Sequence, residues 1–93
     1  MPEVEELISP TDIDTTTESF TLILFNDSYH SFDEVIDQIM KATGFGYDKA
    51  EAITMVVHTK GKAAVLSGEL EKCLRAQSVL EEINLRTEIE VNA

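Results

Sequence analysis

Cysteine and long hydrophobic runs are both scarce in this chain. Its single cysteine, Cys73, cannot form a disulfide within the molecule, so we expect no disulfide framework and a reducing, cytoplasmic location. Nowhere do about 18 apolar residues follow one another. The acidic N-terminus lacks the basic start and the apolar stretch of a secretory signal. The sequence therefore predicts a soluble protein with neither a membrane span nor an export signal.

Basic residues are also few. Seven Lys and Arg stand against 18 Asp and Glu, which gives a formal net charge of -11 at pH 7. A field of this sign repels phosphate backbones and anionic lipids, so we expect neither nucleic acid nor a membrane surface as a partner, and cationic ligands are favoured. The two histidines cannot complete a zinc site without better ligands, and no glycine-rich phosphate loop is present. We therefore expect no metal site and no cofactor.

The 93 residues are enough for one small domain. Residues 1–18 carry six acids, no base and both prolines, a composition too polar to bury itself. We interpret them as a disordered acidic extension. Residues 19–93 hold nearly all the aromatic and aliphatic side chains, which predicts that the folded domain begins near Ser19.

Apolar periodicity after the extension predicts three strands and three helices. The clearest start is the S-x-x-E capping box from Ser31 to Glu34, which opens the first helix. The expected strands cover residues 20–25, 63–66 and 85–91, and the expected helices cover residues 32–43, 48–58 and 69–83. The order β-α-α-β-α-β, with helices on one face of a three-stranded sheet, predicts a two-layer α+β open-faced sandwich.

Residues far apart in the sequence should meet at one end of this sheet, because the chain reverses direction between successive elements. They are Asn26, Asp27, Phe32, Val35, Thr54, His58 and Leu85. The apolar members would form a shallow cup, and the rim would offer an amide oxygen, a carboxylate and an imidazole to an ammonium group. The sequence thus predicts a site for an amino-terminal residue with a large side chain.

Simpler interpretations of the same residues remain open. A lone histidine near the end of a helix is often only a cap stabilised by the helix dipole, and Asn26-Asp27-Ser28 can be a plain turn. Asp27 and His58 could also act as an acid–base pair. That alternative lacks a nucleophile, since Cys73 belongs to another helix. We therefore do not expect an enzyme.

Two segments, LFNDSYHSFDEVIDQI and AEAITMVVHTKGKA, resemble the ClpS family of protease adaptors, and the similarity extends over residues 20–91. The resemblance implies a non-enzymatic adaptor for proteins with a bulky destabilising N-terminal residue (Phe, Tyr, Trp or Leu). It also implies delivery of these N-degron substrates to an AAA+ Clp ATPase, ClpA-like or ClpC-like, that feeds the Clp peptidase. A degenerate adaptor that only docks on the unfoldase and modulates its substrate choice is the alternative. A small acidic adaptor of this kind needs no self-association, so we expect a monomer.

The resemblance also implies roles for individual residues. Asn26 and His58 would hydrogen-bond the substrate's α-ammonium group, Asp27 would add negative charge, and the backbone near His30 would bind the next peptide unit. Glu71 on the last helix would fall on the unfoldase-docking face, and the acidic extension would be presented to the unfoldase. The side-chain pocket would be lined by Phe32, Val35, Thr54, Val57 and Leu85.

Two positions depart from the family pattern. Ser28 stands where many members have a second aspartate, so the rim loses one charge. Thr54 replaces a frequent methionine that gates the pocket against β-branched residues. We therefore expect weaker discrimination between Leu and Ile or Val at the substrate's N-terminus.

Overall fold

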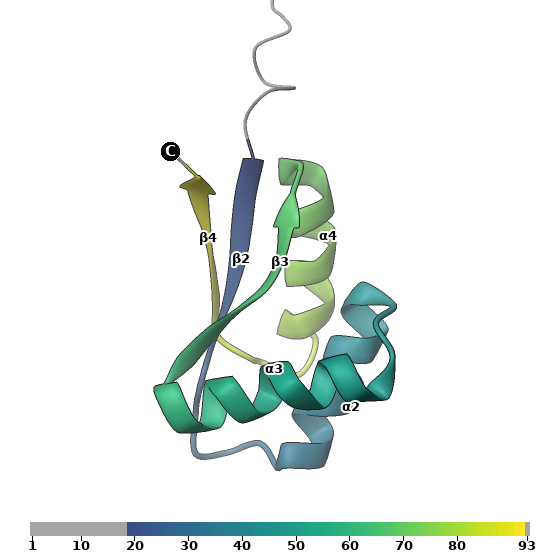
Figure 1. Cartoon of the computed structure of the whole chain (residues 1–93), viewed down its shortest axis with the longest axis vertical. Helices are drawn as coiled ribbons and strands as arrows, with labels where there is room; N and C mark the ends of the chain where they lie inside the picture. The colour runs from purple at the N-terminus through teal and green to yellow at the C-terminus, as the bar shows by residue number, and fades with distance from the viewer. Residues whose placement is uncertain (1–18, 93) are drawn as a thin grey trace, which may run out of the picture.

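The elements of the chain follow the predicted order β-α-α-β-α-β (Figure 1). In this computed structural model the described residues are 19–92, so the predicted acidic extension, residues 1–18, lies outside them. The strands and helices, in chain order, are β2 (Ser19–Phe25), α2 (Phe32–Thr43), α3 (Tyr47–Lys60), β3 (Lys62–Gly68), α4 (Leu70–Glu81) and β4 (Thr87–Asn92). None of the helices in residues 19–92 is long and apolar enough to span a bilayer.

The middle strand of the sheet is β2, and the strand order is β3-β2-β4. Since β2 pairs antiparallel with both neighbours, β3 and β4 run in the same direction on either side of it. Ser19 lies opposite Asn92 at one end of the sheet, and Leu24 lies opposite Thr87 near the other end. The predicted two-layer α+β sandwich with a three-stranded sheet is confirmed.

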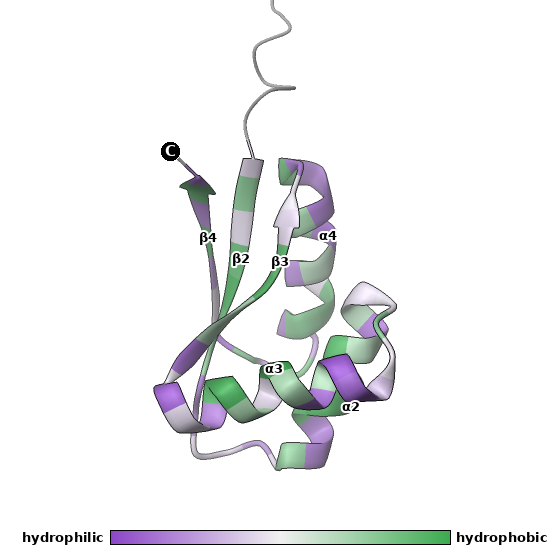
Figure 2. Ribbon diagram, in the orientation of Figure 1, coloured by the Kyte–Doolittle hydropathy of each residue, from purple (hydrophilic) through white to green (hydrophobic). Residues whose placement is uncertain are grey.

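One face of the sheet carries the hydrophobic core. Leu22 and Leu24, two residues apart on β2, point to the same face and are fully buried. Helix α4 contacts all three strands, α3 contacts β3, and α2 packs against both of these helices (Figure 1). Polar and apolar residues alternate over the first part of β2, its second part is apolar throughout, and the helices carry both kinds of residue (Figure 2). The Cys73 thiol is buried in this core, and burial raises its pKa.

The start of α2 is fixed by the predicted capping box. The Ser31 hydroxyl accepts a hydrogen bond from the Glu34 backbone N–H, and the Glu34 carboxylate accepts one from the Ser31 N–H. Helix α3 ends at Gly61, whose left-handed backbone (φ 92°) suits a residue without a Cβ. The carbonyl of Gly61 then accepts the N–H of Asn26, which joins the end of α3 to the end of β2.

Some details differ from the sequence-based expectation. Helix α3 lies across the strand direction rather than along it (Figure 1), and it continues beyond His58 to Lys60. Helix α4 stops at Glu81, short of the expected residue 83, because the chain then turns through Asn84 in a left-handed conformation (φ 64°). Strand β4 consequently begins at Thr87, and Leu85 lies in the preceding connection as a buried residue.

Candidate ligand-binding site

A hollow of about 260 Å³ opens where β2 ends, between the β2–α2 loop and the end of α3. It is lined by Asn26, Asp27, Ser28, His30, Ser31, Phe32, Val35, Thr54, Val57 and His58. A smaller hollow of about 20 Å³ shares several of these residues and adds Leu24, Phe25 and Leu85. Every residue predicted for the rim and the pocket therefore lines one of two adjoining hollows, with Leu85 in the smaller one alone.

The interior of the larger hollow is apolar. Val35, Thr54 and Val57 are buried, and the hydroxyl of Thr54 donates to the carbonyl of Ala50 at 2.8 Å. Because that bond satisfies the Thr54 hydroxyl within α3, a ligand in the hollow needs no polar group to pair with it. The Phe32 ring meets the His58 ring edge to face, with centroids 6.2 Å apart and planes at 85°. The Phe32 ring thus supplies an apolar surface next to the polar ring of His58.

The rim of the hollow offers two hydrogen-bond acceptors, on Asn26 and His58. Asn26 directly follows β2, and His58 lies in the last turn of α3. Both residues are exposed. Among residues 19–92 neither side chain has a hydrogen-bond partner. An amide oxygen and a neutral imidazole nitrogen are suitable acceptors for an ammonium group that stands over an apolar cup.

Asp27 is held firmly within its own loop. Its Oδ1 atom accepts hydrogen bonds from the backbone N–H groups of Tyr29, at 2.9 Å, and His30, at 3.0 Å, and its Oδ2 atom lies 2.8 Å from Nδ1 of His30. Burial pulls the pKa of the Asp27 carboxyl upward, but these hydrogen bonds outweigh it and hold that pKa below its ordinary value. The carboxylate is thus ionised and largely occupied by the loop.

The ring of His30 bridges two loops, which the sequence did not predict. Nδ1 faces the Asp27 carboxylate, and Nε2 faces the carbonyl oxygen of Ile83 in the connection between α4 and β4. The hydrogen bond with Asp27 raises the pKa of the imidazole, and burial opposes this only in part. The backbone N–H of His30 donates to Asp27 and is thus occupied within the loop. Peptide binding by the backbone near His30 stays a prediction. The spacing of Asp27 and His30, three residues apart, could have indicated their contact from the sequence. The contact of His30 with Ile83 could not be foreseen, because the two residues are far apart in the sequence.

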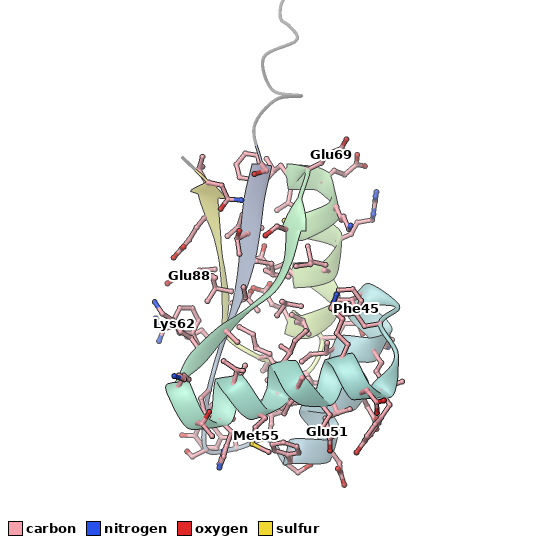
Figure 3. The ribbon with its side chains drawn as sticks, in the orientation of Figure 1. Phe45, Glu51, Met55, Lys62, Glu69 and Glu88 are labelled. Atoms are coloured by element: carbon pink, nitrogen blue, oxygen red, sulfur yellow. The ribbon has the colours of Figure 1, made fainter. Side chains whose placement is uncertain are left out.

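Glu71 lies well away from this site. It is in the first turn of α4, which follows Gly68, the partner of Phe20 at the start of β2. Figure 3 shows Glu69, the residue before α4, at one end of the molecule and Met55 of α3 toward the other. The Glu71 side chain is exposed and pairs with Arg75 at 2.9 Å. Its predicted role in docking stays a prediction.

No metal-binding group was found in the part of the chain that the structure describes: nowhere do three or more His, Cys, Asp or Glu side chains gather as metal ligands would. The arrangement at the end of β2 is that of a binding site. It combines an apolar hollow, two exposed acceptors and a carboxylate that is occupied by its own loop.

Comparison with known proteins gives consistent results. The family model for the ATP-dependent Clp protease adaptor protein ClpS matches residues 15–88. The human E3 ubiquitin-protein ligase UBR1 is 31% identical over 75 residues, which is 81% of this chain and 4% of UBR1. Human UBR2 is 30% identical over 73 residues, which is 76% of this chain and again 4% of the relative. This chain therefore corresponds to a small part of these ligases.

A solved structure has the same fold. The structure of Agrobacterium tumefaciens ClpS2 bound to L-phenylalaninamide matches with a TM-score of 0.73 at 20% sequence identity. The match covers 81% of this chain and 98% of that chain. The identity is low, so this likeness concerns the arrangement of the backbone.

Proposed function

This chain belongs to the ClpS family, the adaptors of the ATP-dependent Clp protease, and from that premise we propose that it binds proteins through a bulky N-terminal residue and delivers them to an AAA+ Clp unfoldase. As an adaptor of this family it is not an enzyme. The substrates would carry Phe, Tyr, Trp or Leu at the N-terminus. The unfoldase would be ClpA-like or ClpC-like.

The main observation behind the proposal is that Asn26 and His58 line the same hollow, together with the apolar side chains of Phe32, Val35 and Val57. A free α-ammonium group would donate to the Asn26 amide oxygen and to the His58 ring, and its side chain would enter between Phe32 and Val57. The ligand in the related ClpS2 structure, L-phenylalaninamide, has both a free amine and an aromatic ring. These are the two chemical features for which this pocket is suited.

Delivery would use other surfaces. We propose that Glu71 and its neighbours on α4 contact the unfoldase and that the acidic residues 1–18 take part in the transfer. A cytoplasmic location and a monomeric state complete the proposal. They are supported by the single, buried thiol of Cys73 and by the strong negative charge, which opposes self-association.

One observation favours the alternative, a degenerate adaptor that modulates the unfoldase without recognising an N-terminus. Ser28 stands at the rim where many members have an aspartate, and the Asp27 carboxylate is occupied by its own loop and faces the His30 ring. Negative charge for an ammonium ligand is therefore limited. The amide and imidazole acceptors remain, so we retain substrate binding as the main proposal.

Calorimetry with matched peptides tests the proposal. A peptide that begins with Phe should bind, and the same peptide with an acetylated N-terminus should not, because acetylation removes the ammonium donors. Equal binding of both peptides, or binding of neither, would contradict N-terminal recognition. A second assay should add a Phe-initiated reporter to a ClpA-like or ClpC-like unfoldase with its peptidase. If the adaptor binds the reporter without accelerating its degradation, the delivery part of the proposal is wrong.

A further inference from the structure

The chain contains two histidines, and both line the same hollow. His58 has a direct role in the proposed function, as an acceptor on the rim. The His30 ring has none, although it is held at both of its nitrogens. Its side chain is only 14% exposed, and each of its ring nitrogens has a partner.

Those two partners are both acceptors. The Asp27 carboxylate has no proton to give, and the Ile83 carbonyl oxygen can only accept. Each ring nitrogen must therefore donate, which requires the doubly protonated imidazolium. A neutral ring would satisfy one partner and place a lone pair against the other.

We propose that the His30 imidazolium is a positioning residue for N-terminal residue binding: it clasps the β2–α2 loop to the α4–β4 connection and so holds the rim over the pocket. This inference rests on the proposed function. One end of the clasp is Asp27, the neighbour of Asn26 on the rim, and the other is Ile83, two residues before the buried Leu85. The ring thus connects the acceptor side of the site with its apolar side.

The charges around the ring are consistent with a cation. Within its own loop His30 faces Asp27, and from α2 the carboxylate of Glu34 adds a weaker attraction. The α4–β4 connection presents the neutral carbonyl of Ile83, and α3 contributes His58 to the same hollow. Glu82, which follows α4, is paired instead with Lys41 of α2 at 2.9 Å. The clasp should therefore weaken as pH rises and the ring loses a proton.

The contribution of His30 can be separated from that of His58, the other histidine of the hollow. Protonation of His30 completes the clasp and should strengthen peptide binding. Since His58 is present in wild type and in the variant His30→Ala, the ratio of their affinities at each pH isolates the contribution of His30.

The test is a titration of a Phe-initiated peptide against both proteins from about pH 5.5 to about pH 8.5, a range that brackets the titration of histidine. We expect His30→Ala to bind about tenfold more weakly at the acidic end, where two charge-assisted hydrogen bonds are lost, and the ratio to fall toward one at the alkaline end. Tyr29→Ala is the matched control: this side chain is 88% exposed, lies in the same loop and lines neither hollow. It should change the affinity less than about twofold.

The outcomes are distinct. Wild-type affinity in His30→Ala, or an affinity ratio that does not change with pH, would overturn the positioning role while the proposed function stands. Absence of amine-dependent binding in wild type would overturn both. Should His30→Ala fail to fold, ¹⁵N NMR of the wild-type histidine rings provides the second measurement. Two protonated nitrogens in His30 at neutral pH are expected, and a neutral ring there would refute the clasp.

Discussion

The backbone N–H of Asn26 donates a hydrogen bond of 2.9 Å to the carbonyl oxygen of Gly61. This bond ties the first residue after β2 to the residue that ends α3, just beyond His58. Two rim groups that are distant in sequence are thus held together through the backbone, and their side chains remain free of each other. The site depends on the turn at Gly61 for this reason.

Replacing Gly61 with Ala should destabilise the domain by about 1–2 kcal/mol, because its φ of 92° is unfavourable for a residue with a Cβ. A Cβ at this position would meet nothing within 4 Å, so the cost comes from the backbone and not from a clash. Urea unfolding measures the difference. Wild-type stability in Gly61→Ala would show that the Gly61 turn tolerates a side chain.

Replacing His58 with Ala should weaken binding of a Phe-initiated peptide by about 1–3 kcal/mol, because one acceptor for the ammonium group is lost. The thermal unfolding midpoint should hardly change, since His58 is exposed. Calorimetry measures the first quantity and circular dichroism the second. Thr59→Ala is a suitable control, because its hydroxyl bonds the Met55 carbonyl and it lines neither hollow. Wild-type affinity in His58→Ala would remove this residue from the site.

Thr54 should allow the pocket to accept β-branched N-terminal residues. Its small side chain lies at the buried floor, so peptides that begin with Ile or Val should bind less than about 100-fold, or roughly 2.7 kcal/mol, more weakly than one that begins with Leu. The variant Thr54→Met should widen this gap, with about 1–3 kcal/mol lost in stability because the floor is already packed. Peptide titrations with both proteins check the prediction. Strict rejection of Ile and Val by wild type would refute it.

The ion pair of Asp27 and His30 should make stability depend on pH. Folding raises the pKa of His30 above its ordinary 6.5, so this contribution is fully present below pH 6.5 and is lost as pH rises through the higher, folded value. Folding lowers the pKa of Asp27 below 3.8, so its contribution is present above pH 3.8 and is lost as pH falls through the lower value. The pair is most stabilising between these two ordinary values.

Urea unfolding of wild type and His30→Ala at about pH 6 and about pH 8.5 measures this dependence. The difference in unfolding free energy between the two proteins should shrink at the higher pH. A difference that stays constant would mean that His30 stabilises the loop by packing alone.

Glu71 allows docking to be separated from peptide binding. Glu71→Lys should leave the affinity for a Phe-initiated peptide unchanged, because the residue lines neither hollow. Unfoldase-dependent degradation of a reporter should slow, because the charge on the proposed docking face is reversed. Glu90→Lys on β4 makes the same charge change elsewhere on the surface and should have no effect. Equal degradation rates in the two variants would exclude Glu71 from docking.

The end of the sheet where the site forms could be predicted because it follows from chain direction. Elements expected to alternate in direction placed Asn26 and His58 at one side, and the two residues do line one hollow although α3 crosses the strands. The capping box at Ser31 fixed where α2 begins. Leu85 was also predicted, because it stands at the same end as the other two. The end of α3 stays at this side despite its different angle, because the Gly61 carbonyl accepts the Asn26 N–H.

The remaining features depend on contacts between distant residues. The apolar pattern of the last helix continues to residue 83, but the left-handed Asn84 and the bond from the Leu85 N–H to the Leu80 carbonyl end α4 early. The His30 bridge depends on where that early turn leaves the Ile83 carbonyl. The crossing of α3 over the strands depends on how α2 and α3 pack. No periodicity in the sequence encodes these geometries.

The pocket and the first turn of α4 lie at opposite ends of β2, a strand of seven residues and therefore roughly 20 Å long. If the docking proposed for Glu71 is correct, the N-terminus of a substrate and the unfoldase would be bound about this distance apart on one small domain. The two proposed contacts would then use separate surfaces, with the length of the sheet between them.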